Sequence, residues 1–191
     1  MRGCDSRSGL IIRNIVWHET QNMLKDNEIQ VAVSILEKLR PGKLPLSVFL
    51  QTTRLTVTPI IEIVPLRKRK DNKVEILLTE RDDTDPNWPG MVHTPGTVVR
   101  STDSEGSYED AFKRILEDEL KGVQTSKPIF VGNLLHKVKR GLESCIVYWV
   151  EVSGKPPTGK FYRFDNLPKN LVDTQIKFIN LAVKHFQDHN K

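Results

Sequence analysis

Cysteine is scarce in this sequence, with only Cys4 and Cys145 among 191 residues. Two cysteines cannot form the disulfide framework of a small secreted domain, and they do not have the spacing of a zinc-binding motif. We interpret Cys145 as a buried strand residue, because it lies in the apolar segment SCIVYWVEV. The cytoplasm is therefore the expected compartment.

Long hydrophobic runs are also missing. No apolar segment approaches the roughly 20 residues that a membrane-spanning helix needs, so we expect no association with a membrane. The N-terminal segment MRGCDSRSGLIIRNIVW has a charge and a short apolar patch, but it lacks the apolar core and the cleavage site of a signal peptide. We therefore do not interpret it as one.

A strong excess of one charge is absent as well. The net charge of +5, from 29 basic and 24 acidic residues, suits a protein that handles phosphates but is common in others. Basic residues cluster at 67–70 and 137–140, where we expect hairpin turns, and no aromatic residues are interleaved with them. We interpret both clusters as solvated turns and do not expect nucleic acid as a partner.

What the sequence does contain is the composition of a globular protein, with 38% hydrophobic and 28% charged residues. We expect an N-terminal helical extension over residues 1–50 and a main domain over residues 51–191. In the extension, a helix is expected within residues 17–40 and a short helix or turn over residues 43–54, after a loosely ordered start at 1–16. The extension would pack on the main domain or on a second subunit, which leaves a homodimer open.

The main domain alternates strands and helices in a definite order. The expected elements are strands at 54–67 and 73–81, a loop at 82–94, a strand end at 95–99, a helix at 108–123, hairpin strands at 127–140 and 142–154, an edge segment within 155–168, and a helix at 170–188. This order predicts a mixed β-sheet sandwiched by helices, which is an α+β fold.

The helix at 108–123 carries one misplaced charge. When it is wound at about 100° per residue, its apolar side contains Tyr108, Ala111, Phe112, Ile115, Leu116, Leu120 and Val123. Glu119 falls near the middle of this side and Asp118 on its edge. A carboxylate facing a core costs several kcal/mol unless it is paired or holds a metal, so Glu119 needs a partner. Glu117 has lysines four residues away on both sides and is interpreted as a solvated helix charge.

The stretch from Pro95 to Val123 resembles the Nudix box, G-x5-E-x7-R-E-U-x-E-E-x-G-U, in which U is a bulky aliphatic residue. Ala111 sets the register, because the family usually has a small residue three positions before the arginine. Arg114 then matches that arginine, and Asp118–Glu119 match the E-E pair. A rival register uses Lys113 as the arginine and Glu117–Asp118 as the pair; we reject it because it leaves Glu119 unexplained.

The box departs from the family pattern at several positions. Ile115 replaces the first glutamate, Thr97 stands in place of the first glycine, and the middle glutamate is either Gly106 or a displaced Glu105. The run AFKRILEDELKG resembles the divergent box of GDP-mannose mannosyl hydrolases, which also lack the first glutamate. In that type the reaction uses a histidine base, for which His93 and His136 are candidates, although a structural role for each is the stronger expectation.

The resemblance implies a Nudix-like α/β/α sandwich and a site for Mg²⁺ or Mn²⁺, ions that prefer oxygen ligands. Glu119 would be the main metal ligand and Asp118 the second, with a backbone carbonyl at Gly96 or Thr97 completing the shell. Arg114 would hold the box by pairing with an acid such as Glu105. Glu119, Asp118 and Arg114 are thus the expected catalytic residues.

The resemblance also implies a substrate, namely a nucleoside diphosphate linked to another group, such as a nucleotide sugar. Trp88 is a candidate for stacking on a base or sugar ring, and Arg81 and Arg100 are candidates for binding phosphate. The degenerate box keeps a second function open, that of a catalytically inactive Nudix-fold module that binds a nucleotide or a protein. The retained Arg114 and Glu119 favour the hydrolase.

Overall fold

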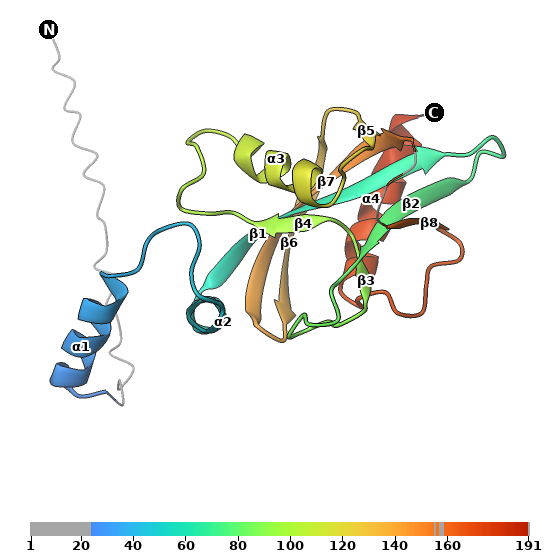
Figure 1. Ribbon diagram of the computed structural model, residues 1–191. Coiled ribbons are helices and arrows are strands. Elements are labelled where there is room, and N and C mark those ends of the chain that lie inside the picture. Colours follow the sequence, from blue (N-terminus) through green and yellow to red (C-terminus); the bar gives the residue numbers. More distant parts are fainter. Residues whose placement is uncertain (1–23, 155, 157–158, 191) are drawn as a thin grey trace, which may run out of the picture. The chain divides into compact units, whose positions relative to one another are not determined.

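The computed structural model describes residues 24–154, 156 and 159–190 (Figure 1). The chain divides into two compact units, residues 1–39 and 40–191. In the first unit, the helix α1 (Asp26–Leu36) lies within the range expected for a helix, and none of its residues is buried. The segment 1–16, expected to be loosely ordered, lies outside the described residues.

The second unit contains the remaining helices and strands. They are α2 (Leu46–Leu55), β1 (Val57–Lys68), β2 (Val74–Glu80), β3 (Val92–His93), β4 (Gly96–Val98), α3 (Glu109–Asp118), β5 (Gln124–Thr125), β6 (Ile129–Val138), β7 (Gly141–Ser153), β8 (Lys160–Arg163) and α4 (Gln175–His189). Across the described residues, no helix has the length and hydrophobicity to cross a lipid bilayer.

The strands form one mixed sheet. Its order is β3-β2-β1-β7-β5, while β4 pairs with β1, β6 with β7, and β8 with β2. The long strands β1 and β7 run parallel at its centre, where residues 57–66 pair with residues 142–151, and the other pairings are antiparallel. The predicted α+β architecture with a mixed sheet is therefore confirmed.

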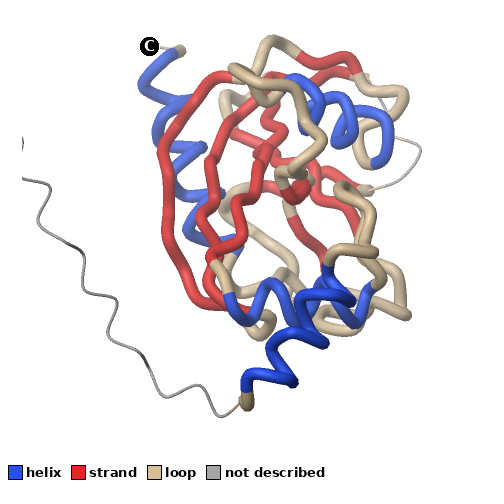
Figure 2. The backbone as a smooth tube through the Cα atoms, turned by 90° about the vertical axis from the view of Figure 1, so that its left-hand side faces the viewer, coloured by secondary structure: helices blue, strands red, loops and turns tan. Residues whose placement is uncertain are grey.

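Side chains of β1 alternate between two hydrophobic cores, because successive residues of a strand face opposite sides of the sheet. Ile60 and Val64 pack in the core beneath α4, and Ile61 and Ile63 pack in the core beneath α3. The two helices thus cover opposite faces of the sheet (Figure 2).

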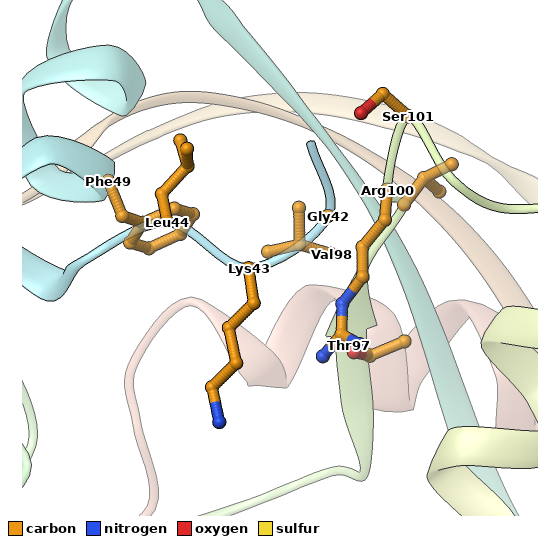
Figure 3. Close-up of a pocket in the computed structure, with 9 residues that line it drawn as sticks. Gly42, Lys43, Leu44, Phe49, Thr97, Val98, Arg100 and Ser101 are labelled. Atoms are coloured by element: carbon orange, nitrogen blue, oxygen red, sulfur yellow. The ribbon is translucent and has the colours of Figure 1, made fainter. Parts of the chain in front are cut away.

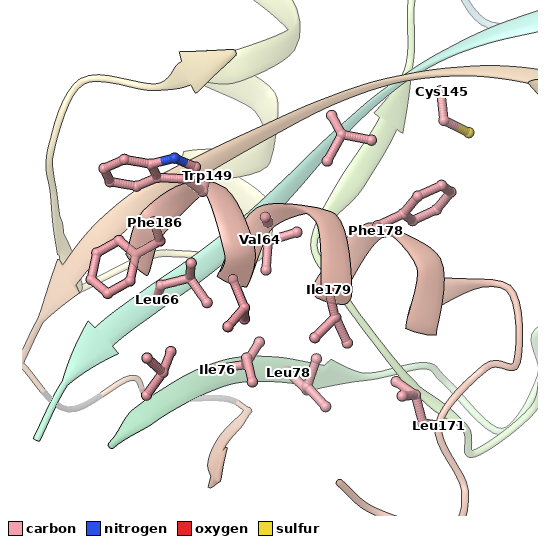
Figure 4. Close-up of a cluster of buried hydrophobic side chains, with 14 of the residues drawn as sticks. Val64, Leu66, Ile76, Leu78, Cys145, Trp149, Leu171, Phe178, Ile179 and Phe186 are labelled. Carbon is pink, nitrogen blue, oxygen red and sulfur yellow. The ribbon is translucent and has the colours of Figure 1, made fainter. Parts of the chain in front are cut away.

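The core beneath α4 is the larger of the two (Figure 4). Phe178 and Phe186 of α4 are fully buried in it, together with Trp149 of β7. Each large apolar side chain buried there stabilises the fold by about 1.5–3 kcal/mol. This core, and the smaller one beneath α3, hold the central strands rigidly between two helices.

Helix α3 ends earlier than the sequence pattern suggested. The pattern predicted a helix over residues 108–123, but the regular helix ends at Asp118, and Glu119 is its C-terminal cap. The amides of Glu119 and Leu120 both bond to the carbonyl of Ile115, and Gly122 has the left-handed φ of 78° that closes many helices. This turn buries Leu120. The chain therefore folds back onto the sheet at Glu119, the acid that the helical pattern left without a partner.

Candidate active site at the end of helix α3

The Glu119 carboxylate lies against the sheet and is held by neutral donors. The Thr79 hydroxyl donates to Oε2 over 2.9 Å, and the backbone N–H of Gly96 donates to Oε1 over 3.1 Å. Burial raises the pKa of Glu119, and these two hydrogen bonds oppose the rise. Hydrogen bonds from the protein therefore replace those that water would give to the Glu119 carboxylate, and about a fifth of its side chain remains exposed.

His93 extends this network from β3. Its Nε2 lies 3.3 Å from the Thr79 hydroxyl oxygen and 3.5 Å from Oε2 of Glu119. Burial lowers the pKa of His93 to about 3, so the ring is neutral near pH 7. An Nε2–H that donates to Thr79, while Thr79 donates to Glu119, satisfies all three groups. His93, one of the two candidate bases, is thus a neighbour of the box acid.

A second carboxylate, Glu62 of β1, lies on the other side of Gly96. A Cβ added to Gly96 would come within 2.8 Å of Oε2 of Glu62, so only glycine lets the carboxylate lie there. The same residue donates its N–H to Glu119. Gly96 was expected to offer its backbone carbonyl to a metal. The structure shows its N–H bonded to Glu119 and its Cα against the carboxylate of Glu62.

Glu62 is buried among polar partners. The Thr94 hydroxyl donates to Oε2 over 3.0 Å, and Nε2 of Gln175 in α4 lies 3.5 Å from Oε1. Burial raises the pKa of Glu62 to about 8, with the charge of Glu119 adding to the rise. Glu62 therefore lies inside the fold as a carboxylic acid near neutral pH.

Asp118, the other member of the acid pair, is exposed at the end of α3. Within the described part of the chain its side chain has no ion pair. Glu117, the acid that only the rejected register uses, faces solvent and lies 4.0 Å from Lys113, which is 72% exposed. Glu119 thus lies beside Gly96, and its neighbour Asp118 faces solvent at the end of the helix.

Arg114 holds the loop before the helix, as the resemblance implied, but through a different acid. Its guanidinium contacts both carboxylate oxygens of Asp103, at 2.5 and 2.9 Å, and donates to the carbonyl of Val98. The expected partner Glu105 is therefore wrong. Asp103 follows strand β4 more closely in the sequence than Glu105 does, and the Arg114 side chain of α3 reaches it. The hydrogen bonds from Arg114 are the main cause that lowers the pKa of Asp103.

Ile115 occupies the position of the first box glutamate. Its side chain is fully buried in the core beneath α3. The position therefore faces the protein interior and contributes packing in place of a ligand. A metal at this site would have only Asp118 and Glu119 as acidic ligands from the helix.

Arg81 and Trp88, two of the candidate substrate-binding residues, lie next to each other. The guanidinium of Arg81 donates to Asp85 over 2.8 Å and lies 5.1 Å from the centre of the Trp88 ring. Arg140 lies over the same ring at 5.4 Å. Two cations thus lie near the Trp88 ring, and Arg81 already has an acidic partner in the protein.

Arg100 lines a pocket of about 260 Å³ beside β4 (Figure 3). Lys43, Phe49 and Thr97 are among the other residues of this pocket. The side chains of Arg100 and Lys43 extend in the same direction, so two cations share one pocket. Two positive charges in one pocket favour an anion over a cation there.

His136, the second candidate base, lies elsewhere. It belongs to β6 and contacts Glu143 and Cys145 of β7 on the face covered by α4. Glu119 lies under α3, so the structure does not bring His136 to the box acids.

Four residues of this region were missed by sequence reasoning: Glu62, Thr79, Thr94 and Asp103. Only Glu62 carried a signal, since it is a lone acid in the strand IIEIV. Threonines and a loop aspartate are too common in such contexts to be singled out from one sequence.

Comparisons with solved structures find several with a similar fold. The MutT NUDIX hydrolase of Burkholderia pseudomallei superposes with a TM-score of 0.52 and 18% identity, covering 66% of this chain and 98% of that one. The NUDIX domain of NrtR from Shewanella oneidensis, in complex with ADP ribose, gives 0.54 and 15%, covering 81% and 97%. A MutT/nudix family protein from Enterococcus faecalis gives 0.52 and 12%, covering 84% and 69%.

At these identities the comparisons establish the fold. The chain has the fold of the Nudix hydrolases, a mixed sheet between flanking helices. No family model matches the sequence, and no curated protein matches it.

Proposed function

We propose that this protein is a divalent-metal-dependent Nudix-type hydrolase that cleaves a nucleoside diphosphate linked to another group. The observation that carries the proposal is the acid pair Asp118–Glu119 at the end of α3, with Glu119 hydrogen-bonded to Gly96. The ADP ribose bound by the NrtR domain belongs to this chemical class. Nucleotide sugars belong to it as well.

The residues present fit Mg²⁺ or Mn²⁺. Both acids offer carboxylate oxygens, and such ions commonly use one or two protein carboxylates together with water and phosphate oxygens. The donors around Glu119 are neutral, so they favour its ionised form without neutralising it. A bound ion would neutralise charge that develops on the diphosphate and lower the pKa of an attacking water.

The remaining residues have positioning roles in this proposal. Arg114 and Asp103 fix the loop that leads into α3. Thr79 and Gly96 orient Glu119, and His93 supports Thr79 as a neutral ring. Arg100 and Lys43 offer positive charge to the phosphates, while Trp88 offers a ring face for stacking.

The test compares three carboxylate-to-amide variants on one helix end. ADP ribose and a panel of nucleotide sugars are incubated with Mg²⁺ or Mn²⁺, and product release is followed by chromatography. Glu119→Gln is expected to lower kcat/KM at least 100-fold, since removing one key electrostatic group commonly has such an effect. Asp118→Asn is expected to lower it roughly tenfold.

The matched control is Glu117→Gln, which removes a carboxylate from the same helix but from its exposed side. It should leave kcat/KM within about twofold of wild type. Calorimetric titration with Mg²⁺ should show binding to wild type and loss in Glu119→Gln. Equal activity in Glu119→Gln and Glu117→Gln would reject the proposed site.

A second function is favoured by one observation, the burial of Ile115 at the first box position. A site with fewer acidic ligands suits a Nudix-fold module that binds a nucleotide without cleaving it. In that case wild type would bind ADP ribose in calorimetry, release no product with either ion, and retain binding in Glu119→Gln.

A further inference from the structure

A second group of ligand-type side chains lies on the opposite face of the sheet, beneath α4. His136 of β6 pairs directly with Glu143 of β7, and Cys145 follows two residues later on the same face. All three are buried, and their ligand atoms lie within 4.8 Å of one another. Two adjacent antiparallel strands therefore present three different ligand types to one point.

Two of the three distances in this group match those between the ligands of a tetrahedral ion. Nε2 of His136 lies 3.3 Å from Oε2 of Glu143 and 3.4 Å from Sγ of Cys145. An ion bound at about 2.0–2.2 Å to nitrogen and oxygen and about 2.3 Å to sulfur separates such ligand atoms by roughly 3.3–3.6 Å. The shared nitrogen is thus at ligand-to-ligand distance from both other atoms.

The same geometry excludes a catalytic triad. In a triad, the nucleophile and the acid contact different nitrogens of the imidazole ring, so that the ring passes a proton between them. Here sulfur and carboxylate both face Nε2, and Nδ1 has no hydrogen-bond partner among the described residues. Cys145 is also fully buried, so a substrate cannot reach its sulfur.

Hydrogen bonding alone leaves the group incompletely satisfied. Nε2 carries at most one proton, which it can donate to Glu143 or to the sulfur but not fully to both. Arg140 occupies the other carboxylate oxygen of Glu143 at 2.5 Å and so fixes the orientation of that group. An ion at the shared point would use the nitrogen, the oxygen and the sulfur together, with Arg140 as an outer-shell partner of the carboxylate.

We propose that His136, Glu143 and Cys145 form a zinc site inside the fold. The donor set selects the metal, because a thiolate with an imidazole suits Zn²⁺ and not Mg²⁺. The charges of a thiolate and a carboxylate balance those of the ion, and the extra positive charge of Arg140 lies on a side chain that is partly exposed to solvent. Phe178 of α4 lies beside the site, with its ring centre 5.1 Å from that of His136. Figure 4 shows Phe178 on the same side of the sheet as Cys145. Three protein ligands leave the fourth position of a tetrahedral ion to a water molecule. The proposal is independent of the function of the box acids.

The test uses Co²⁺ as a probe for zinc in the full-length chain. The purified protein is stripped with a chelator and then titrated with Co²⁺, whose bond to a thiolate gives a sulfur-to-metal absorption band in the near ultraviolet. One equivalent should produce this band, and Zn²⁺ should abolish it. Zn²⁺ should also raise the melting temperature of the stripped protein by roughly 5–10 °C, because it binds the folded state.

The matched control exploits the only other cysteine of the chain. Cys145→Ser should lose the band and the shift in melting temperature, whereas Cys4→Ser should keep both. His136→Gln should weaken Co²⁺ binding at least 100-fold while keeping the thiol. Glu119→Gln should bind Co²⁺ with an unchanged sulfur band.

Three outcomes would overturn the proposal. One is the absence of a sulfur band in wild type, and another is a band that disappears in Cys4→Ser. The third is a Zn²⁺ shift in melting temperature that survives in Cys145→Ser but is lost in Glu119→Gln, which would place the ion at the box. Circular dichroism of each stripped variant verifies that it is folded; Cys145→Ala replaces Cys145→Ser if the serine variant is not.

Discussion

The two faces of the sheet treat their acidic residues differently. Under α3, Glu119 lies at the edge of a small core, and neutral donors hold it where about a fifth of its side chain remains exposed. Under α4, Glu62 and Glu143 lie within the fold, one with Thr94 and the other with Arg140. The first face leaves part of its carboxylate exposed to solvent, and the second places its carboxylates in the interior.

Gly96 connects the two faces. Its N–H contacts Glu119, and its Cα lies against the carboxylate of Glu62. The charge of Glu119 raises the free-energy cost of ionising Glu62, because two negative charges repel strongly where water is excluded. The comparison therefore predicts that removing the buried acid will affect stability and that removing the edge acid will affect ligand binding.

The largest effect is expected from Glu62→Gln. The pKa of Glu62 is about 8 in the folded protein and near 4.5 in the unfolded chain, so folding favours the protonated form. This stability is fully present below pH 4.5 and is lost as the pH rises through about 8, by on the order of 3–5 kcal/mol. Urea unfolding between pH 5 and 9, with chelator present, should show a much flatter profile for Glu62→Gln. An equally steep profile would mean that Glu62 is ionised in the fold.

Arg114→Ala is expected to have the next largest effect, since it leaves the Asp103 carboxylate without its bidentate partner. Both side chains are less than a fifth exposed, so the free energy of unfolding should fall by about 2–4 kcal/mol. Lys113→Ala, on the adjacent exposed position, is the control and should change it by less than about 0.5 kcal/mol. Similar losses in both variants would show that the pair does not hold the loop.

Gly96→Ala should show whether the close approach to Glu62 matters. The added Cβ would overlap the buried carboxylate, and overpacking of this kind destabilises by about 1–3 kcal/mol. The double variant Gly96→Ala with Glu62→Ala tests the source of the effect, because it removes the carboxylate that the new Cβ would overlap. In that background Gly96→Ala should cost much less stability, and an unchanged loss would locate the strain elsewhere.

Trp88→Ala is expected to have the smallest effect on stability. Both Arg81 and Arg140 lie near the Trp88 ring, and each cation–π contact at a partly exposed site contributes about 0.5–1 kcal/mol. Trp88→Phe keeps a ring face and should recover much of the loss in urea unfolding. If Trp88→Phe is as unstable as Trp88→Ala, the ring face is not what stabilises this contact.

The sequence predicted most of the fold, because alternation in the strands and the amphipathic pattern of α3 are local signals. It also singled out Glu119, since a charge on an apolar helix side is visible without a structure. It did not reveal the partners of that acid. Thr79 and Gly96 are brought to Glu119 by strand pairing, and the contact between Arg114 and Asp103 depends on how the loop closes.

The cluster beneath α4 was hidden for a different reason. His136 and Glu143 were each visible as polar residues of a hairpin, but which face of the sheet they occupy depends on register. A shift of one residue in that pairing would turn them toward the other side. Cys145 was correctly expected to be buried, although a single cysteine carried no information about its neighbours.

The parallel pairing of β1 with β7 has a consequence for how the protein folds. Residues 57–66 meet residues 142–151 only after the whole intervening chain, including α3, has been synthesised. Contacts between such distant segments form slowly, because closing a long loop costs entropy before any contact is made. Both faces of the sheet depend on this late step, so a nascent chain that ends before β7 presents the box acids without the central strand pairing of the finished sheet.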